Sequence, residues 1–224
     1  MAAVVARLAP LDVPLVIDSR DPQVLAVAAQ ALPEGRAILN SVQLQNGDAG
    51  VEEVVRLALR HDAAIVGLCL DERGMARTID HKLQAARRLF EIVVERCGLP
   101  PSSLYVDPLV FALPSRDASW AASAAETMQA LRRIKETLTE VRTMVGISDV
   151  SFGLPPSARK ILNAAFLHHC TEAGVDAAIV ELTDVRSYAD LPVAERARAD
   201  AVLFNRAPDA LQRFAEAFEP RPSG

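Results

Sequence analysis

Polar side chains follow four of the short apolar runs in this chain, at the point where each run ends. They are Asp18, Asn40, Asp107 and Asp149. If the runs are parallel strands, their carboxyl ends share one edge, which is where α/β barrels and sheets carry their active sites. Capping of the following helix is the simpler interpretation, and we prefer it for Asp21, which precedes a proline. For the other four side chains together, the pattern favours a functional site.

The apolar runs predict strands buried on both faces, because they are rich in Val, Ile and Leu and show little polar alternation. They lie at 13–17, 37–39, 63–70, 104–106, 143–147 and 177–180. Amphipathic segments between them predict helices at 22–32, 51–61, 80–96, 119–141, 156–173 and 209–218. Gly98 and Gly174 are placed to end two of these helices. The alternation predicts an α/β fold with a parallel sheet, in one domain over residues 1–219 followed by a tail at 220–224.

The composition is that of a folded chain, because half of the 224 residues are hydrophobic and 24% are charged. A net charge of −5 argues against a nucleic-acid-binding protein, which usually has a basic face. We expect no membrane segment, because no apolar run approaches the roughly 18 residues that span a bilayer. The three widely spaced cysteines predict no disulfide framework, which favours a reducing, cytoplasmic location.

Six stretches of the chain resemble the pterin-binding methyltransferases, in the family's order and at similar spacing. They read LVIDSR from residue 15, AILNS from 37, LYVDPLV from 104, GISDVSFGLP from 146, RKILNAAFL from 159 and AGVDAAI from 173. The chain is most similar to the methyltetrahydrofolate:corrinoid methyltransferases and to the folate domain of cobalamin-dependent methionine synthase, with dihydropteroate synthase more distant. The resemblance implies an α/β fold, a TIM-barrel-like (β/α) barrel of the dihydropteroate synthase type, with six recognisable βα units.

The resemblance also implies roles for individual residues. A pterin presents an amino group and a ring N–H side by side, and one carboxylate can accept hydrogen bonds from both. This role falls to Asp107, with Asp18 and Asn40 completing the contacts to the ring. Ser148 and Arg159 are further pterin-binding candidates. The loop before Arg159 is either an anion site at a helix start or an ordinary capped loop.

The chain departs from the family pattern in two ways. The motifs of the family's first two strands are not found, so we expect a barrel that lacks two βα units and has free edges at 15–17 and 177–180. Such edges predict a homo-oligomer or a complementing chain. At position 149, the family's asparagine that meets the reactive pterin nitrogen is an aspartate. Asp149 is either a general acid, if burial raises its pKa, or a sign of weakened catalysis.

Other reactive residue types favour structural roles. His168, His169 and Cys170 are consecutive, and adjacent helical positions point about 100° apart, so we predict no metal site there. Cys69 ends a buried run without a partner for thiolate chemistry, so we interpret it as a core residue.

The function that these patterns favour is enzymatic methyl transfer between methyltetrahydrofolate, or a related pterin, and a corrinoid protein. The corrinoid (cobalamin) would be carried by a partner chain or domain, because the sequence has no Asp-x-His-x-x-Gly motif. A catalytically weakened or inactive pterin-binding subunit is the first alternative. Dihydropteroate synthesis is a weaker one, because the basic signatures expected for that chemistry are missing near the last strands.

Overall fold

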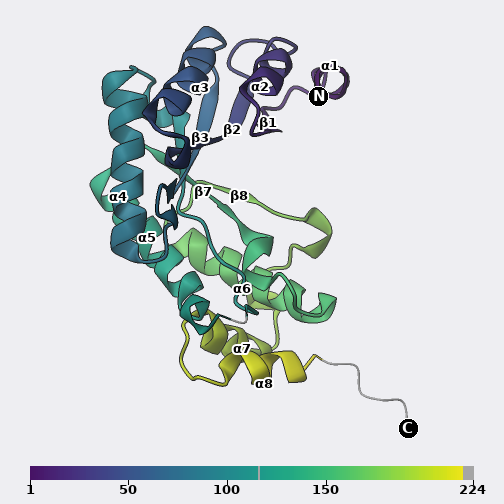
Figure 1. Ribbon diagram of the computed structural model, residues 1–224. Coiled ribbons are helices and arrows are strands. Elements are labelled where there is room, and N and C mark those ends of the chain that lie inside the picture. The colour runs from purple at the N-terminus through teal and green to yellow at the C-terminus, as the bar shows by residue number, and fades with distance from the viewer. Residues whose placement is uncertain (116, 219–224) are drawn as a thin grey trace. The chain divides into compact units, whose positions relative to one another are not determined.

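The computed structural model describes residues 1–115 and 117–218 (Figure 1), so the tail predicted at 220–224 lies outside the described residues. The chain divides into two compact units. The first comprises Met1–Ala76, Asp80–Pro108 and Ile134–Met144, and the second comprises Arg77–Ile79, Leu109–Arg133 and the residues from Val145 onward. The expectation of a single domain over 1–219 stays a prediction.

All six predicted strands are present, and they belong to one sheet in the order β1, β2, β3, β6, β7, β8. Their bounds are β1 Leu15–Asp18, β2 Ala37–Gln43, β3 Ala64–Leu68, β6 Leu104–Asp107, β7 Arg142–Gly146 and β8 Ala177–Ile179. The four pairings from β1 to β7 are parallel, as predicted. Among the described residues, β1 and β8 form the two edges of this sheet, which are the edges that the sequence predicts.

The prediction that every strand is buried on both faces is correct for the central strand β6 and wrong for the edges. All four residues of β6 are buried. In contrast, Val16 of β1 is 44% exposed and Ile179 of β8 is 45% exposed, because an edge strand has a neighbouring strand on one side only.

The apolar run predicted as one strand at 63–70 is divided. The strand β3 ends at Leu68, and a short hairpin of β4 (Leu70–Asp71) and β5 (Gly74–Met75) follows. Between them, the Cys69 N–H donates to the Asp107 carbonyl at 2.9 Å. The hairpin turns at Glu72 and Arg73, and Gly74, which follows the turn, has a positive φ of 96° that is accessible to glycine without strain.

The first unit contains α1, α2, α3 and most of α4. Their bounds are α1 Ala2–Leu8, α2 Pro22–Ala29, α3 Asp48–Arg60 and α4 Ile79–Phe90, which continues as a π-helix over Glu91–Arg96. Helices α2 and α3 pack against β1, β2 and β3 (Figure 1). The predicted cap of α2 is confirmed, since the Asp21 carboxylate accepts a hydrogen bond from the Gln23 N–H at 2.8 Å. Gly98 has a positive φ of 78° just after the π-helix, as a helix stop requires.

The second unit contains most of α5 and all of α6, α7 and α8. Their bounds are α5 Ser123–Thr137, α6 Pro156–Glu172, α7 Val193–Leu203 and α8 Ala210–Glu216. The helix α5 is shorter than the segment predicted at 119–141. The helix α7 was not predicted, because alternating alanines and charges give its sequence no broad apolar stripe. Each unit has its own apolar core, centred on Ile65 and Leu104 in the first and on Phe166 and Phe214 in the second. None of the described helices combines the length and apolar character that a membrane crossing needs.

Candidate functional site

The register of the sheet places Asp18, Asn40 and Asp107 on one face of the first unit's strands. Asp18 pairs with Asn40, Asn40 pairs with Val66, and Val66 pairs with Tyr105. Paired residues project to the same side of a sheet, and so do residues two apart in one strand. Asp107 comes two residues after Tyr105 and therefore faces the same side. The structure thus brings the three predicted pterin-binding residues of this unit to one face near the strands' carboxyl ends.

The opposite face of these strands is the one that packs against the helices. Ile17, Leu39, Ile65 and Leu104 alternate with the polar face, and each is at most 2% exposed. The apolar core therefore fixes the strands from one side and leaves the other side to carry polar groups. On that polar side Asp18 is exposed, Asn40 is half-buried and Asp107 is buried.

A lysine that the sequence did not single out holds the loop after Asp107. The Lys82 side chain, from the first turn of α4, is fully buried, and its Nζ donates a hydrogen bond to the Pro108 carbonyl at 2.6 Å. A buried ammonium group needs such partners, because desolvating it without them is costly. The helical position of Lys82 carried a signal, because the buried Ala85, Ala86 and Leu89 follow it by three, four and seven residues and place it on the apolar face of α4.

Charged groups gather around the buried thiol of Cys69. This thiol donates to the Lys82 carbonyl at 3.4 Å. Burial raises the pKa of Cys69 to about 12. The positive charge of Lys82 acts to lower this pKa, and the negative charges of Asp107 and Asp71 act to raise it. The thiol is therefore protonated at neutral pH, and the interpretation of Cys69 as a core residue is confirmed by its burial.

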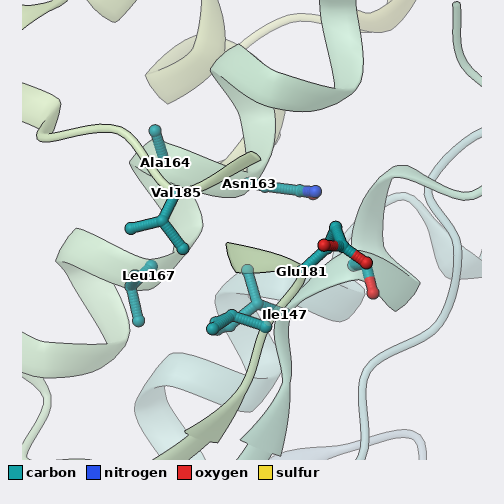
Figure 2. Close-up of a pocket in the computed structure, with 8 residues that line it drawn as sticks. Ile147, Asn163, Ala164, Leu167, Glu181 and Val185 are labelled. Carbon is teal, nitrogen blue, oxygen red and sulfur yellow. The ribbon is translucent and has the colours of Figure 1, made fainter. Parts of the chain in front are cut away.

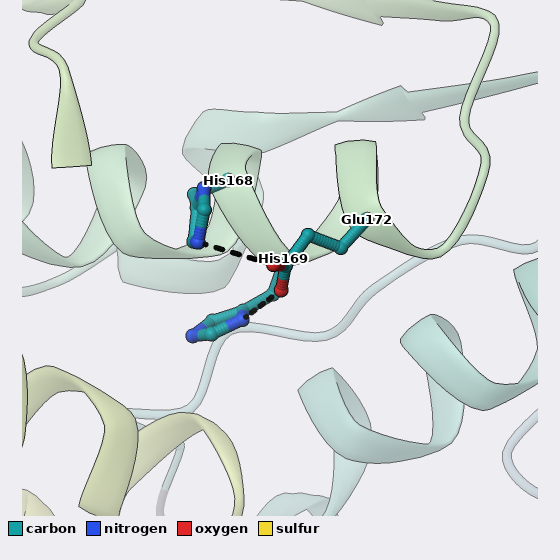
Figure 3. A group of neighbouring side chains, drawn as sticks. All are labelled: His168, His169 and Glu172. Atoms are coloured by element: carbon teal, nitrogen blue, oxygen red, sulfur yellow. Dashed lines mark hydrogen bonds and ion pairs between the residues drawn. The ribbon is translucent and has the colours of Figure 1, made fainter. Parts of the chain in front are cut away.

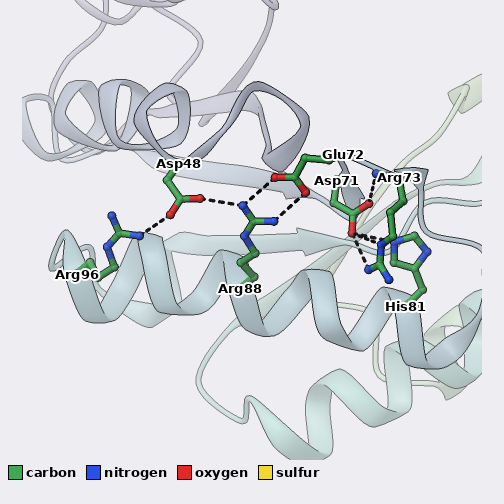
Figure 4. Close-up of polar contacts among 7 residues, drawn as sticks. All are labelled: Asp48, Asp71, Glu72, Arg73, His81, Arg88 and Arg96. Carbon is green, nitrogen blue, oxygen red and sulfur yellow. Dashed lines mark hydrogen bonds and ion pairs between the residues drawn. The ribbon is translucent and has the colours of Figure 1, made fainter.

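Asp71 in β4 is the centre of a second buried polar cluster (Figure 4). Arg73 donates to its Oδ2 through Nη2 at 2.7 Å and Nε at 3.1 Å, and His81 Nε2 lies 2.9 Å from the same oxygen. Burial by itself would raise the pKa of Asp71, but the hydrogen bonds from Arg73 and His81 lower it to about 2. Because His81 precedes Lys82, this cluster fixes the start of α4 next to the β4–β5 hairpin.

Ion pairs also connect α4 and its π-helical end to α3 (Figure 4). Arg88 bridges Asp48 at 3.0 Å and Glu72 at 2.8 Å, and Arg96 reaches Asp48 at 2.6 Å and also pairs with Glu52. Hydrogen bonds from Arg96 and Arg88 lower the pKa of Asp48. These contacts lie at the surface, so their role is to orient α4 more than to stabilise the fold.

In the second unit, Ser148 and Asp149 lie in a 3₁₀ helix, Ile147–Ser151, directly after β7. The Asp149 carboxylate lies over Gly146, where an added Cβ would come within 2.5 Å of Asp149 Oδ2. Its side chain keeps contact with solvent, yet the surrounding protein desolvates it enough to raise its pKa, and the positive charge of Arg159 opposes that rise. The direction is the one that a general acid requires.

Arg159 is tied to the same 3₁₀ helix. Its Nε donates to Ser151 Oγ at 3.3 Å, and Ser151 Oγ donates to the Ser148 carbonyl at 3.2 Å. The structure therefore brings Ser148, Asp149 and Arg159 together within the second unit. Their contact with a pterin stays a prediction.

A small pocket opens beside Ser148 (Figure 2). It is lined by Ile147, Ser148, Asn163, Ala164, Leu167, Val180, Glu181 and Val185. Asn163 of α6 is 7% exposed, and its Oδ1 has no hydrogen-bond partner among the described residues, so it can accept a bond from a bound group. Asn163 was not predicted from the sequence, although it lies one helical turn after Arg159 and thus on the same side of α6. Glu181 accepts from the Thr183 N–H at 3.4 Å, which assigns it to capping.

Comparison with known proteins supports the family that these residues suggest. A family model described as "Pterin binding enzyme" matches residues 1–181. The chain is 35% identical over 210 residues to methionine synthase from Mycobacterium leprae (strain TN), covering 92% of this chain and 17% of that protein. It is 34% identical over 226 residues to methionine synthase from Mycobacterium tuberculosis, covering 98% of this chain and 19% of that protein. The chain therefore spans less than a fifth of either relative's length.

The solved structures that resemble this chain have the same fold. Dihydropteroate synthase from Yersinia pestis aligns with a TM-score of 0.54 at 20% identity, over 92% of this chain and 77% of that one. Dihydropteroate synthase from Xanthomonas albilineans, in complex with 7,8-dihydropteroate, aligns with a TM-score of 0.55 at 18% identity, over 98% of this chain and 73% of that one. The predicted TIM-barrel-like α/β fold of the dihydropteroate synthase type is confirmed. Together with the family match over most of its length, this shows that the chain belongs to the pterin-binding enzyme family.

Proposed function

We propose that this chain binds the pterin ring of methyltetrahydrofolate, or of a related folate, on the polar face of its first unit. The observation that carries the proposal is the common face of Asp18, Asn40 and Asp107. The Asp107 carboxylate would accept the pterin amino group and ring N–H together, in the charge-assisted bidentate geometry that is among the strongest in proteins. The Asn40 amide both donates and accepts, which suits the lactam edge of the ring. Asp18 would complete these contacts.

The reaction that we propose is transfer of the methyl group from a pterin nitrogen to a reduced corrinoid carried by another domain or chain. The likeness to methionine synthases supports this reaction over dihydropteroate synthesis. The pterin nitrogen is a poor leaving group until it gains a proton or a hydrogen bond. The family resemblance assigns the hydrogen bond to that nitrogen to Asp149, and further pterin-binding roles to Ser148 and Arg159.

Calorimetry with methyltetrahydrofolate tests the binding step. Asp107→Ala removes a charge-assisted contact and leaves the ligand's donors unpaired, so we expect a loss of about 2–4 kcal/mol, roughly 30- to 900-fold in Kd. Asp12→Ala is the matched control, because Asp12 is fully exposed and lies 3.6 Å from Arg36. Equal affinity of wild type and Asp107→Ala, or no binding to a folded wild-type chain, would contradict the proposal.

Pterin binding without methyl transfer is the second candidate function. It is favoured by the aspartate at position 149, because a carboxylate donates a hydrogen bond only while protonated; desolvation raises the pKa of Asp149, but the Arg159 charge opposes that rise. Single-turnover measurements with cob(I)alamin supplied in solution separate the two candidates. Folate binding with no methyl transfer at any pH would assign the chain to the second.

A further inference from the structure

A cluster of three possible metal ligands lies at the carboxyl end of α6 in the second unit, and the pterin site does not use it (Figure 3). One donor atom each from His168, His169 and Glu172 lies within 4.8 Å of the others. The His168 Nε2 is 3.6 Å from Glu172 Oε1, and the His169 Nδ1 is 3.2 Å from Glu172 Oε2. Adjacent histidines diverge on a helix, but Glu172 follows them by four and three positions and so faces both rings.

Each ring nitrogen of His169 faces a carboxylate oxygen. Its Nδ1 faces Glu172, while its Nε2 lies 2.9 Å from Asp200 Oδ1 of α7. A neutral imidazole carries a single ring N–H. If the proton is on Nε2, then Nδ1 presents a lone pair to Glu172. If the proton is on Nδ1, then Nε2 presents a lone pair to Asp200. A cation shared by Nδ1 and Glu172 removes this repulsion between two acceptors.

The surrounding residues hold both rings in the orientation that such a cation needs. Tyr188 donates its O–H to Asp200 Oδ2 at 2.8 Å, so Asp200 is fixed from its other oxygen. The His168 ring stacks on the Tyr188 ring with centroids 4.3 Å apart and planes 6° apart. A carboxylate that accepts the second N–H of a ligating histidine is the usual outer partner in metal sites. His169 and Asp200 have this arrangement.

We propose that His168, His169 and Glu172 bind a divalent transition-metal ion of the zinc type, with Asp200 as the outer partner of His169. Two imidazoles and one carboxylate are a donor set that suits Zn²⁺ and Co²⁺, and three protein ligands leave a position for water. The His168 and Glu172 side chains are 37% and 54% exposed, so an ion can reach the site from solvent. The metal would connect α6 to α7 and to the Tyr188 turn, a structural role that is independent of the proposed pterin chemistry.

Titration of the untagged 224-residue chain with Zn²⁺ tests this proposal. We expect one Zn²⁺ per chain by calorimetry, a rise in the thermal midpoint with Zn²⁺, and visible absorption bands with Co²⁺. Glu172→Gln removes an exposed ligand that no core residue needs, and we expect at least a tenfold weaker Zn²⁺ affinity. Asp200→Asn should weaken the affinity by about 10- to 100-fold, as loss of an outer partner does.

His61→Gln is the matched control, because His61 ends α3 in the other unit and should leave the affinity unchanged. Absence of Zn²⁺ binding to the folded chain would overturn the proposal. Equal Zn²⁺ affinity in wild type and Glu172→Gln would overturn it as well, because the ion would then bind elsewhere.

Discussion

The ammonium group of Lys82 lies 2.6 Å from the carbonyl oxygen of Pro108, the residue directly after Asp107. This hydrogen bond connects the first turn of α4 to the carboxyl end of β6, across 26 positions of sequence. Both side chains next to this link, Lys82 and Asp107, are buried. The lysine is thus a positioning residue for the loop that orients the proposed pterin-binding carboxylate.

Replacing Lys82 with methionine tests this role. Lys82→Met keeps the length of the side chain but leaves the Pro108 carbonyl without its donor, which costs about 1–3 kcal/mol of stability for a buried acceptor. We also expect weaker methyltetrahydrofolate binding, because the Asp107 loop loses its support. Urea unfolding and calorimetry measure the two effects. Arg87→Met, on an exposed position of the same helix, is the control. Binding unchanged in a destabilised Lys82→Met would limit the lysine to a structural role.

Replacing Asp149 with asparagine should raise methyl transfer near neutral pH. An amide donates a hydrogen bond at every pH, whereas the Asp149 carboxylate donates only when protonated. Burial raises its pKa and Arg159 opposes the rise, so we expect the wild-type rate to fall as pH increases from 5 to 8 and the Asp149→Asn rate to stay flat. Single-turnover rates of methyl transfer, measured for both proteins over this pH range, test this expectation. A lower maximum rate for Asp149→Asn would instead identify Asp149 as a working general acid.

A methyl group added at Gly146 should act through Asp149. The backbone of Gly146 has φ −76°, which any residue adopts, so Gly146→Ala introduces no backbone strain. Its Cβ would lie 2.5 Å from Asp149 Oδ2 and would displace that carboxylate. We therefore expect Gly146→Ala to change the methyl-transfer rate in wild type and to have no effect in an Asp149→Ala background. An equal effect in both backgrounds would place the cause elsewhere.

Acid should remove the contribution that Asp71 makes to stability. Its pKa in the folded protein is about 2, below the unfolded value of about 3.9. A group with a depressed pKa stabilises the fold above its unfolded pKa, and this contribution is lost as pH falls through the folded pKa. The difference in unfolding free energy between wild type and Asp71→Asn should therefore be constant above about pH 5 and should shrink between about pH 4 and 2. Urea midpoints at several pH values measure it. A difference independent of pH would exclude the ion pair as its source.

The edge strands predict self-association. Val16 and Ile179 present apolar side chains on β1 and β8, whose outer backbone groups have no strand partner among the described residues. Such edges pair with other strands or aggregate unless they are covered. Light scattering should therefore show assemblies larger than one chain, and Val16→Lys combined with Ile179→Lys should reduce them. Val193→Lys, at an exposed position of α7, should not. A stable monomer that binds no hydrophobic dye would contradict this prediction.

The sequence alone determined which polar residues follow which strands, and where some of the helices begin or end. Runs of Val, Ile and Leu predict buried strands because their burial follows from composition over a few neighbouring residues. Asp21 and Gly98 mark helix ends for equally local reasons, a side-chain cap and a positive φ. The placement of Asp18, Asn40 and Asp107 at strand ends was likewise visible, and the parallel register then put them on one face.

Only the tertiary structure decided which charged side chains are buried and what they contact. Lys82 meets a carbonyl 26 positions away, and His169 meets Asp200 at a separation of 31. Helical periodicity places Lys82 on the apolar face of α4, but it cannot identify either partner, and a charge enters the interior only where a distant partner offsets the cost of desolvation. The burial of Asn163 is likewise decided by tertiary structure, since it depends on the packing of α6 in its unit. Local patterns define which face of an element is apolar, and long-range contacts define the chemistry of the few polar groups that this face encloses.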